Sequence, residues 1–126
     1  MYSKKTLEYF MHPKNIGELK NCSGKGNVGS PVCGDVIDFY IKVDDKTKKI
    51  IDAKFLSFGC ASNIATSSIL TELIIGKTID EAKKITFNDI TKELGGLPKI
   101  KIHCSVLAIE AMNEAIKDYQ KKSTDL

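Results

Sequence analysis

The chain has 126 residues, 42% of them hydrophobic and 28% charged, which is the composition of an ordinary globular protein, and we expect residues 1–126 to form one domain. All 19 basic residues are lysines and the net charge is +3. Nucleic-acid sites rely heavily on arginine, so nucleic-acid binding is not expected. There is no apolar run of membrane-spanning length and no secretory leader, which predicts a cytoplasmic protein with no membrane partner.

The first thirty residues predict a short helix followed by a loop. Ser3 is suited to cap a helix over residues 4–11, and Pro13 ends it. The glycine-rich stretch 15–30 indicates a loop, or a short edge strand near Asn27.

Two strands joined by a polar turn are predicted next. Apolar and polar residues alternate over 36–43, and a second apolar stretch covers 50–58, with a lysine- and aspartate-rich turn between them. Ile51, Ala53 and Phe55 share one face of the second strand, and a shift in the alternation near Leu56 indicates either a β-bulge or burial of both faces there.

The second half of the chain is predicted to be helical. Cys60 opens a helix over 61–75 that is apolar on most faces and is therefore expected to be buried. Short helices follow over 78–84 and 86–94. The last helix has an apolar stripe at helical spacing, made of Cys104, Leu107, Ala108, Ala111, Met112, Ala115, Ile116 and Tyr119. The predicted fold is α+β, with an antiparallel sheet of two or three strands packed on one face by the helices that begin at Cys60 and Cys104.

The four cysteines are Cys22, Cys33, Cys60 and Cys104, and no two of them form a CxxC pair. In a cytosolic protein, scattered cysteines are more often metal ligands or reactive thiols than disulfides. A metal site must then be assembled by the fold from distant segments. Cys22 has no other candidate ligand close to it in the sequence, and no role is assigned to it.

The predicted hairpin brings several of the possible ligands together. In an antiparallel pair, the start of the first strand lies beside the end of the second. Cys33 and Asp35 are therefore expected next to Cys60. Residues two apart share a face of extended backbone, so Cys33 and Asp35 can point the same way.

His103 and Cys104 stand at the mouth of the last helix. The partial positive charge of a helix N-terminus stabilises a thiolate, the form that binds metal or attacks sulfur. The alternative is that Cys104 is an inert, buried thiol. If the last helix reaches the end of the hairpin, three thiols, an imidazole and a carboxylate meet there, which suits zinc or an iron–sulfur cluster. Three cysteines with one unlike ligand suit a cluster that must leave.

Three blocks in this chain resemble the signature blocks of the iron–sulfur scaffold proteins, namely the NifU N-terminal domain and its relative IscU. The resemblance runs from about Tyr9 to Tyr119. The blocks are Cys33-Gly34-Asp35, then Phe58-Gly59-Cys60-Ala61-Ser62 followed by Ile64-Ala65-Thr66-Ser67-Ser68, and finally Leu97-Pro98 with Lys101-Ile102-His103-Cys104-Ser105.

The resemblance implies a labile [2Fe–2S] cluster on Cys33, Cys60 and Cys104, with Asp35 or His103 completing the coordination. It implies that sulfur arrives from a cysteine desulfurase, with Cys104 as persulfide acceptor, and that apo iron–sulfur proteins receive the cluster. Such a protein is a carrier rather than a turnover enzyme. Asp35 is then the residue that influences cluster release, and zinc can occupy the same ligands.

Two departures from the family pattern narrow the prediction. Chaperone-dependent members carry Leu-Pro-Pro-Val-Lys before the His-Cys pair, whereas this chain has lysine at position 99 in place of the second proline. This counts against delivery through a dedicated Hsp70 and J-protein pair. The long insertion typical of the SufU branch is absent, which counts against the alternative function, a zinc-binding sulfur acceptor that activates a desulfurase.

Overall fold

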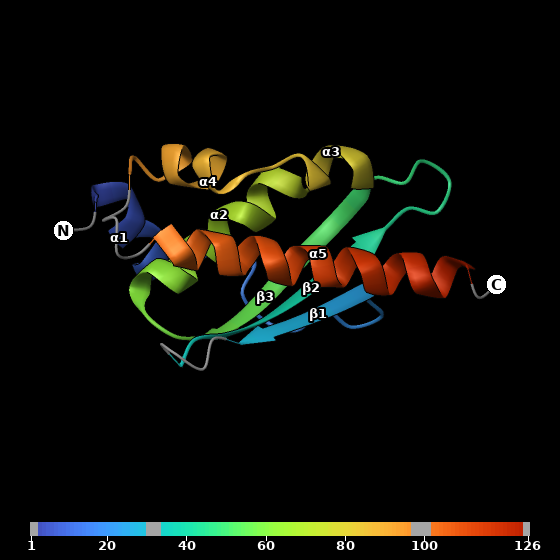
Figure 1. The fold of residues 1–126 in the computed structure, drawn as a ribbon, viewed down its shortest axis with the longest axis horizontal. Coiled ribbons are helices and arrows are strands. Elements are labelled where there is room, and N and C mark those ends of the chain that lie inside the picture. The colour runs from blue at the N-terminus through green and yellow to red at the C-terminus, as the bar shows by residue number, and fades with distance from the viewer. Residues whose placement is uncertain (1–2, 30–33, 97–101, 125–126) are drawn as a thin grey trace.

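The computed structural model describes residues 3–29, 34–96 and 102–124, and these contain five helices and three strands (Figure 1). In chain order the elements are α1 (Lys4–Met11), β1 (Gly24–Gly29), β2 (Val36–Val43), β3 (Ile50–Phe58), α2 (Ala61–Ile74), α3 (Ile79–Lys83), α4 (Phe87–Glu93) and α5 (Ile102–Thr124).

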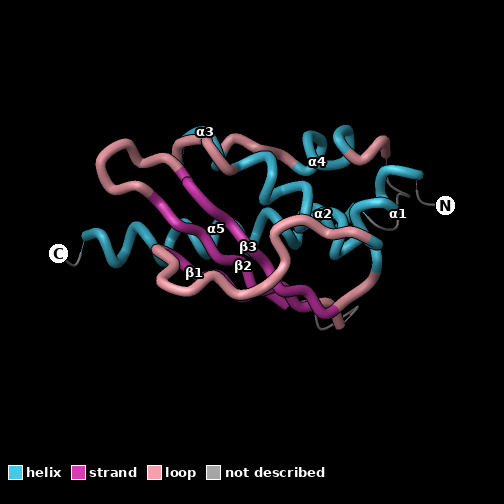
Figure 2. Tube along the Cα trace, turned by 180° about the vertical axis from the view of Figure 1, so that it is seen from behind, coloured by secondary structure: helices cyan, strands magenta, loops and turns pink. Residues whose placement is uncertain are grey.

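The strands form one antiparallel sheet in the order β1-β2-β3. Helices α2 and α5 cover one face of it: α5 contacts β1 and β2, α2 contacts β3, and the two helices contact each other. Figure 2 shows the sheet from behind, with the chain between α1 and β1 crossing that side. The predicted α+β fold is confirmed. Strand β1, which the sequence predicted as either a loop or a short edge strand, joins the two predicted strands in the sheet. Within the described residues, no helix is both long and apolar enough to cross a membrane.

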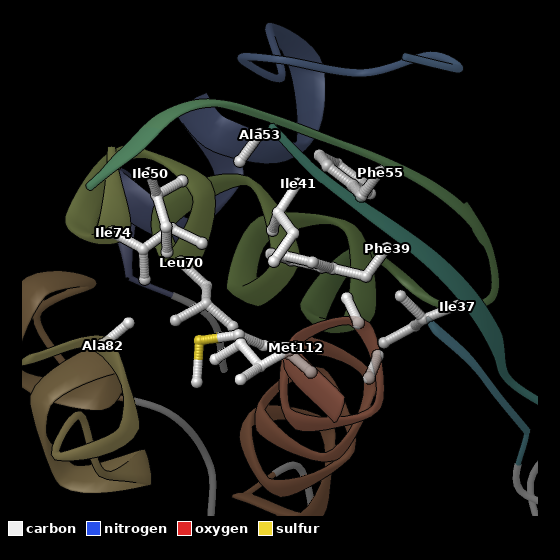
Figure 3. Close-up of a cluster of buried hydrophobic side chains, with 14 of the residues drawn as sticks. Ile37, Phe39, Ile41, Ile50, Ala53, Phe55, Leu70, Ile74, Ala82 and Met112 are labelled. Atoms are coloured by element: carbon white, nitrogen blue, oxygen red, sulfur yellow. The ribbon is translucent and has the colours of Figure 1, made fainter. Parts of the chain in front are cut away.

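The hydrophobic core lies between the sheet and the two helices (Figure 3). Its largest fully buried side chains include Phe39, Phe55, Leu70, Ile74 and Met112. Burying one such side chain stabilises the fold by about 1.5–3 kcal/mol. The predicted stripe of α5 is buried from Leu107 to Tyr119, while the side chain of Cys104 lies outside the described part.

The predicted shared face of β3 was wrong at one residue, and the bulge was predicted at the wrong end of the strand. Ile51 is 56% exposed, and Ile50 is buried in its place. The register shifts where Val43 pairs with Ile50 but Lys42 pairs with Asp52, so Ile51 is the extra residue. The alternation then continues unbroken to Phe58, which is 66% exposed. Leu56 and Phe58 are apolar although they lie on the outer face of β3, so the sequence pattern there resembled a change of face.

Two glycines of β1 let α5 approach the sheet closely. A Cβ atom on Gly24 would overlap the carbonyl oxygen of Ala115, and one on Gly26 would overlap that of Ala111. The backbone N–H of Lys25 also donates a hydrogen bond to Asp118 Oδ2 of α5, at 2.9 Å. The last helix therefore rests on the backbone of β1 itself.

Capping side chains fix the starts of the short helices. The predicted cap of α1 is confirmed, since Ser3 accepts from the backbone N–H of Thr6. At α4, Thr86 Oγ1 accepts from the backbone N–H of Asp89, and Asp89 Oδ2 accepts from that of Thr86 at 2.9 Å. The two bonds satisfy N–H groups that the helix itself leaves without partners.

Replacing Thr86 with alanine is expected to lower the free energy of unfolding by about 1 kcal/mol, because one N–H group of α4 loses its capping acceptor. Urea unfolding followed by circular dichroism measures this change. Thr86→Ser keeps the hydroxyl and should stay close to the native protein. Equal losses in both variants would mean that the methyl group, and not the hydrogen bond, matters.

Candidate metal centre

The end of the β2–β3 hairpin brings Asp35 against the residue that precedes Cys60. Val36, the first residue of β2, pairs with Phe58, the last residue of β3. Asp35, just before β2, and Gly59, just after β3, are therefore the next two residues to face each other. A Cβ atom on Gly59 would overlap Asp35 Oδ1 and would lie 2.9 Å from Asp35 Cγ. The carboxyl group therefore occupies the space that a side chain at Gly59 would need. The predicted meeting of Asp35 with the Cys60 segment is confirmed.

Asp35 belongs to the helix-covered side of the sheet. Only 5% of its surface is exposed, and it lies two residues before Ile37, a fully buried core residue. A carboxyl group at such a buried position needs charged or hydrogen-bonding partners. Its placement next to the start of α2 puts it near the positive end of a helix dipole.

Cys60 is the N-cap residue of α2. Its backbone is extended, with φ −77° and ψ 172°, and its thiol makes no capping hydrogen bond within the described first turn. The residue is partly buried and its thiol is not in a disulfide. A partly accessible cysteine thiol outside a disulfide can serve as a metal ligand.

The backbone of His103 and Cys104 lies in the first turn of α5. The starts of α2 and α5, the start of β2 and the end of β3 all lie toward the same end of the molecule in both views (Figures 1 and 2). Cys33 and the side chains of His103 and Cys104 lie outside the described residues. The described residues alone contain no group of three His, Cys, Asp or Glu side chains that could hold a metal ion.

Cys22 does not lie at the end of the sheet where Asp35 and Cys60 meet. The next residue, Ser23, donates its backbone N–H to the carbonyl oxygen of Ile41 and accepts a hydrogen bond from Val43. Cys22 is therefore at the opposite end of β2 from Asp35. This position agrees with leaving it out of the predicted ligand set.

The sequence prediction missed Asn63, a fully buried residue in the first turn of α2. Its Oδ1 atom accepts a hydrogen bond from Ser57 of β3. Its Nδ2 atom has no hydrogen-bond partner among the described residues and lies 3.1 Å from the position of a Cβ on Gly59. The available signal was an amide side chain in the first turn of a helix that was expected to be buried.

Comparison with known proteins gives consistent matches along the chain. A sequence model of the family described as NifU-like N terminal domain matches residues 1–125. The iron–sulfur cluster assembly scaffold protein IscU 1 of Archaeoglobus fulgidus is 52% identical over 123 residues, which cover 98% of this chain and 79% of that protein. The scaffold protein IscU of Aquifex aeolicus is 48% identical over 121 residues, covering 96% and 77% respectively.

A solved structure agrees with the fold described above. The N-terminal part of a nitrogen-fixing NifU-like protein from Brucella abortus superposes with a TM-score of 0.73. The match covers 95% of this chain and 94% of that one at 23% sequence identity. At this identity the likeness shows the shared fold.

Proposed function

Because the chain belongs to the family of NifU-like N-terminal domains, we propose that it is an iron–sulfur assembly scaffold. A labile [2Fe–2S] cluster is built on it from iron and sulfur and is then passed to apo-proteins. Residues 1–126 act as one scaffold domain in this proposal. The observation that carries it is the buried Asp35 carboxyl packed on Gly59, the residue that precedes Cys60 at the start of α2.

The proposed ligands of the cluster are Cys33, Cys60 and Cys104, with Asp35 or His103 completing the coordination. The cluster is the cargo of the protein rather than its resident cofactor. Thiolates are the usual ligands of iron–sulfur clusters, and a carboxylate is a poorer match for iron in such a site. The mixed ligand set therefore favours a cluster that can be released. Zinc can bind the same thiolates.

Sulfur is proposed to reach the scaffold on Cys104. The Cys104 thiolate attacks the outer sulfur of a persulfide on a cysteine desulfurase. A new S–S bond forms on Cys104, the S–S bond of the donor breaks, and the desulfurase leaves as a thiolate, so no external oxidant is consumed. The position of Cys104 in the first turn of α5 supports this role, because a helix N-terminus stabilises the attacking thiolate. The protein acts here as a carrier and not as a turnover enzyme.

Anaerobic reconstitution tests the proposal. The protein is incubated with iron, cysteine and a desulfurase, and its visible spectrum, iron content and sulfide content are measured. We expect a [2Fe–2S] spectrum that disappears when apo-ferredoxin is added while the ferredoxin gains the cluster. Cys60→Ala should prevent loading, and Cys22→Ala should load normally. No iron uptake, together with tightly held zinc and a persulfide on Cys104, would instead indicate a zinc-binding sulfur acceptor.

Replacing Asp35 with alanine is expected to lengthen the lifetime of the loaded cluster severalfold, because the oxygen ligand that weakens its coordination is gone. The decay of the visible absorbance in the presence of a chelator measures the lifetime. Asp38→Ala is the matched control, since Asp38 lies in β2, three residues after Asp35, and accepts a hydrogen bond from Asn27 of β1. An unchanged or shorter lifetime in Asp35→Ala would refute the role of Asp35 in release.

A further inference from the structure

The hydroxyl group of Ser3 serves two helices at once. It accepts a hydrogen bond from the backbone N–H of Thr6, at 3.1 Å, and so caps the start of α1. It also donates a hydrogen bond to the backbone carbonyl oxygen of Leu94, the C-cap residue of α4. The last carbonyl groups of a helix have no partner within the helix, so a donor from another element stabilises them. The first turn of α1 therefore holds the exit of α4.

Thr6 reinforces this contact from within α1. Its side chain is fully buried, and its hydroxyl oxygen lies 2.9 Å from Ser3 Oγ and 3.5 Å from the Leu94 carbonyl oxygen. Lys5 and Glu93 add an ion pair between the same two helices, but both side chains are about half exposed, so this pair contributes little. The contact of Ser3 and Thr6 with Leu94 is named the α1–α4 link below.

Helix α1 is in turn fixed to α2, the helix that begins after Cys60. The two helices contact each other. Just after α1, the backbone N–H of Lys14 donates to Ser68 Oγ of α2 at 2.7 Å, and Asn15 Nδ2 donates to Thr71 Oγ1 at 3.1 Å. The α1–α4 link therefore holds the exit of α4 at a set place relative to α2.

The chain turns away from α4 directly after the link. Gly95 and Gly96 have positive φ values of 76° and 103°, which glycine adopts without strain. Residues 97–101, outside the described part, then connect to α5, whose first turn includes Cys104. The end of α4 and the start of α5 lie toward the same end of the molecule as α1 (Figure 1). The position of Leu94 therefore sets where the connection to Cys104 begins.

We propose that Ser3 and Thr6 are positioning residues for Cys104. Their hydroxyl groups hold the exit of α4 against α1 and α2, which fixes the start of the segment that leads to Cys104. Without the link, Cys104 is held less firmly relative to Cys60, so its thiol becomes more accessible and the cluster is retained for a shorter time. The part of this inference that concerns the cluster rests on the proposed scaffold function.

Substitutions at Ser3 separate the link from the cap. Ser3→Asp keeps a good N-cap acceptor for α1, but an ionised carboxylate cannot donate a hydrogen bond to the Leu94 carbonyl oxygen and repels it. Ser3→Thr keeps the hydroxyl and should behave like the native protein. Thr6→Val is a second variant, because it removes the other hydroxyl at nearly the same size. Thr86→Ala is the control, since it weakens α4 at the opposite end and leaves the link intact.

Alkylation of the reduced, metal-free protein by iodoacetamide tests the proposal without a cluster. Peptide mass spectrometry gives the rates at Cys104 and Cys60 in the same sample. We expect the ratio of the Cys104 rate to the Cys60 rate to rise severalfold in Ser3→Asp and in Thr6→Val, and to stay close to the native value in Ser3→Thr and Thr86→Ala. An unchanged ratio in both Ser3→Asp and Thr6→Val, or an equal rise in Thr86→Ala, would overturn the proposal.

The lifetime of the loaded cluster is the second readout, measured with the chelator as for Asp35→Ala. It should be severalfold shorter in Ser3→Asp and unchanged in Ser3→Thr. A native lifetime in Ser3→Asp would refute the effect of the link on the cluster. If the native protein takes up no cluster, the scaffold function fails, while the alkylation ratio still decides whether the link positions Cys104.

Discussion

Replacing Gly26 with alanine is expected to lower the free energy of unfolding by about 1–3 kcal/mol, the range for overpacking a tightly packed interior. The added methyl group would overlap the carbonyl oxygen of Ala111 and lie 2.6 Å from the backbone nitrogen of Ala115. Both atoms belong to the backbone of α5, so no side-chain rotation can relieve the contact. The helix must move away from β1. Urea unfolding followed by circular dichroism measures the loss.

Gly29→Ala is the matched control for this change. Gly29 is on the same strand, and a Cβ there would meet its nearest atom, Val36 Cγ2, at 3.5 Å, an ordinary contact. Neither glycine has the positive φ that would make any side chain unfavourable. Where space allows, alanine stabilises relative to glycine by restricting the unfolded chain. Similar losses in the two variants would mean that the approach of α5 is not what requires glycine at position 26.

Replacing Gly59 with alanine is expected to lengthen the lifetime of a loaded cluster at least as much as Asp35→Ala does. The methyl group would overlap Asp35 Oδ1 and lie 2.9 Å from Asp35 Cγ. The carboxylate must therefore leave its position beside Gly59. Decay of the visible absorbance under the chelator conditions used for Asp35→Ala measures the effect.

The free energy of unfolding provides an independent check on Gly59→Ala. In the native background the substitution is expected to cost about 1–3 kcal/mol, because a buried charged group is displaced. In the Asp35→Ala background the cost should be much smaller, since the overlapping atoms are gone. An equal cost in the two backgrounds would show that the methyl group conflicts with something other than Asp35.

Local signals in the sequence were sufficient for much of the fold. Ser3 caps the first helix as predicted, and the alternation of residues 36–43 predicted the strand β2. The hairpin register followed from the polar turn, and it correctly brought Asp35 to Gly59. Each of these features depends on residues close together in the chain.

Features that depend on distant parts of the chain were predicted less well. Strand β1 runs from Gly24 to Gly29, although glycine weakens strands, because packing under α5 decides its conformation. The bulge at Ile51 depends on which apolar residue remains outside, and periodicity alone does not reveal that. The functions of the proposed ligands all stay predictions, namely Cys33, Asp35, Cys60, His103 and Cys104.

The packing of β1 under α5 has a consequence for the order in which the protein folds during synthesis. Gly24 meets Ala115 and Tyr119, a contact between opposite ends of the chain, and contacts of such long sequence separation form late. On the ribosome, the β2–β3 hairpin and α2 can pair before α5 emerges. A nascent chain that stops short of Ile102 then contains Asp35 and Cys60 but neither His103 nor Cys104. The proposed ligand set is complete only when α5 has packed on β1, so an unfinished chain lacks part of the set that would bind the cluster.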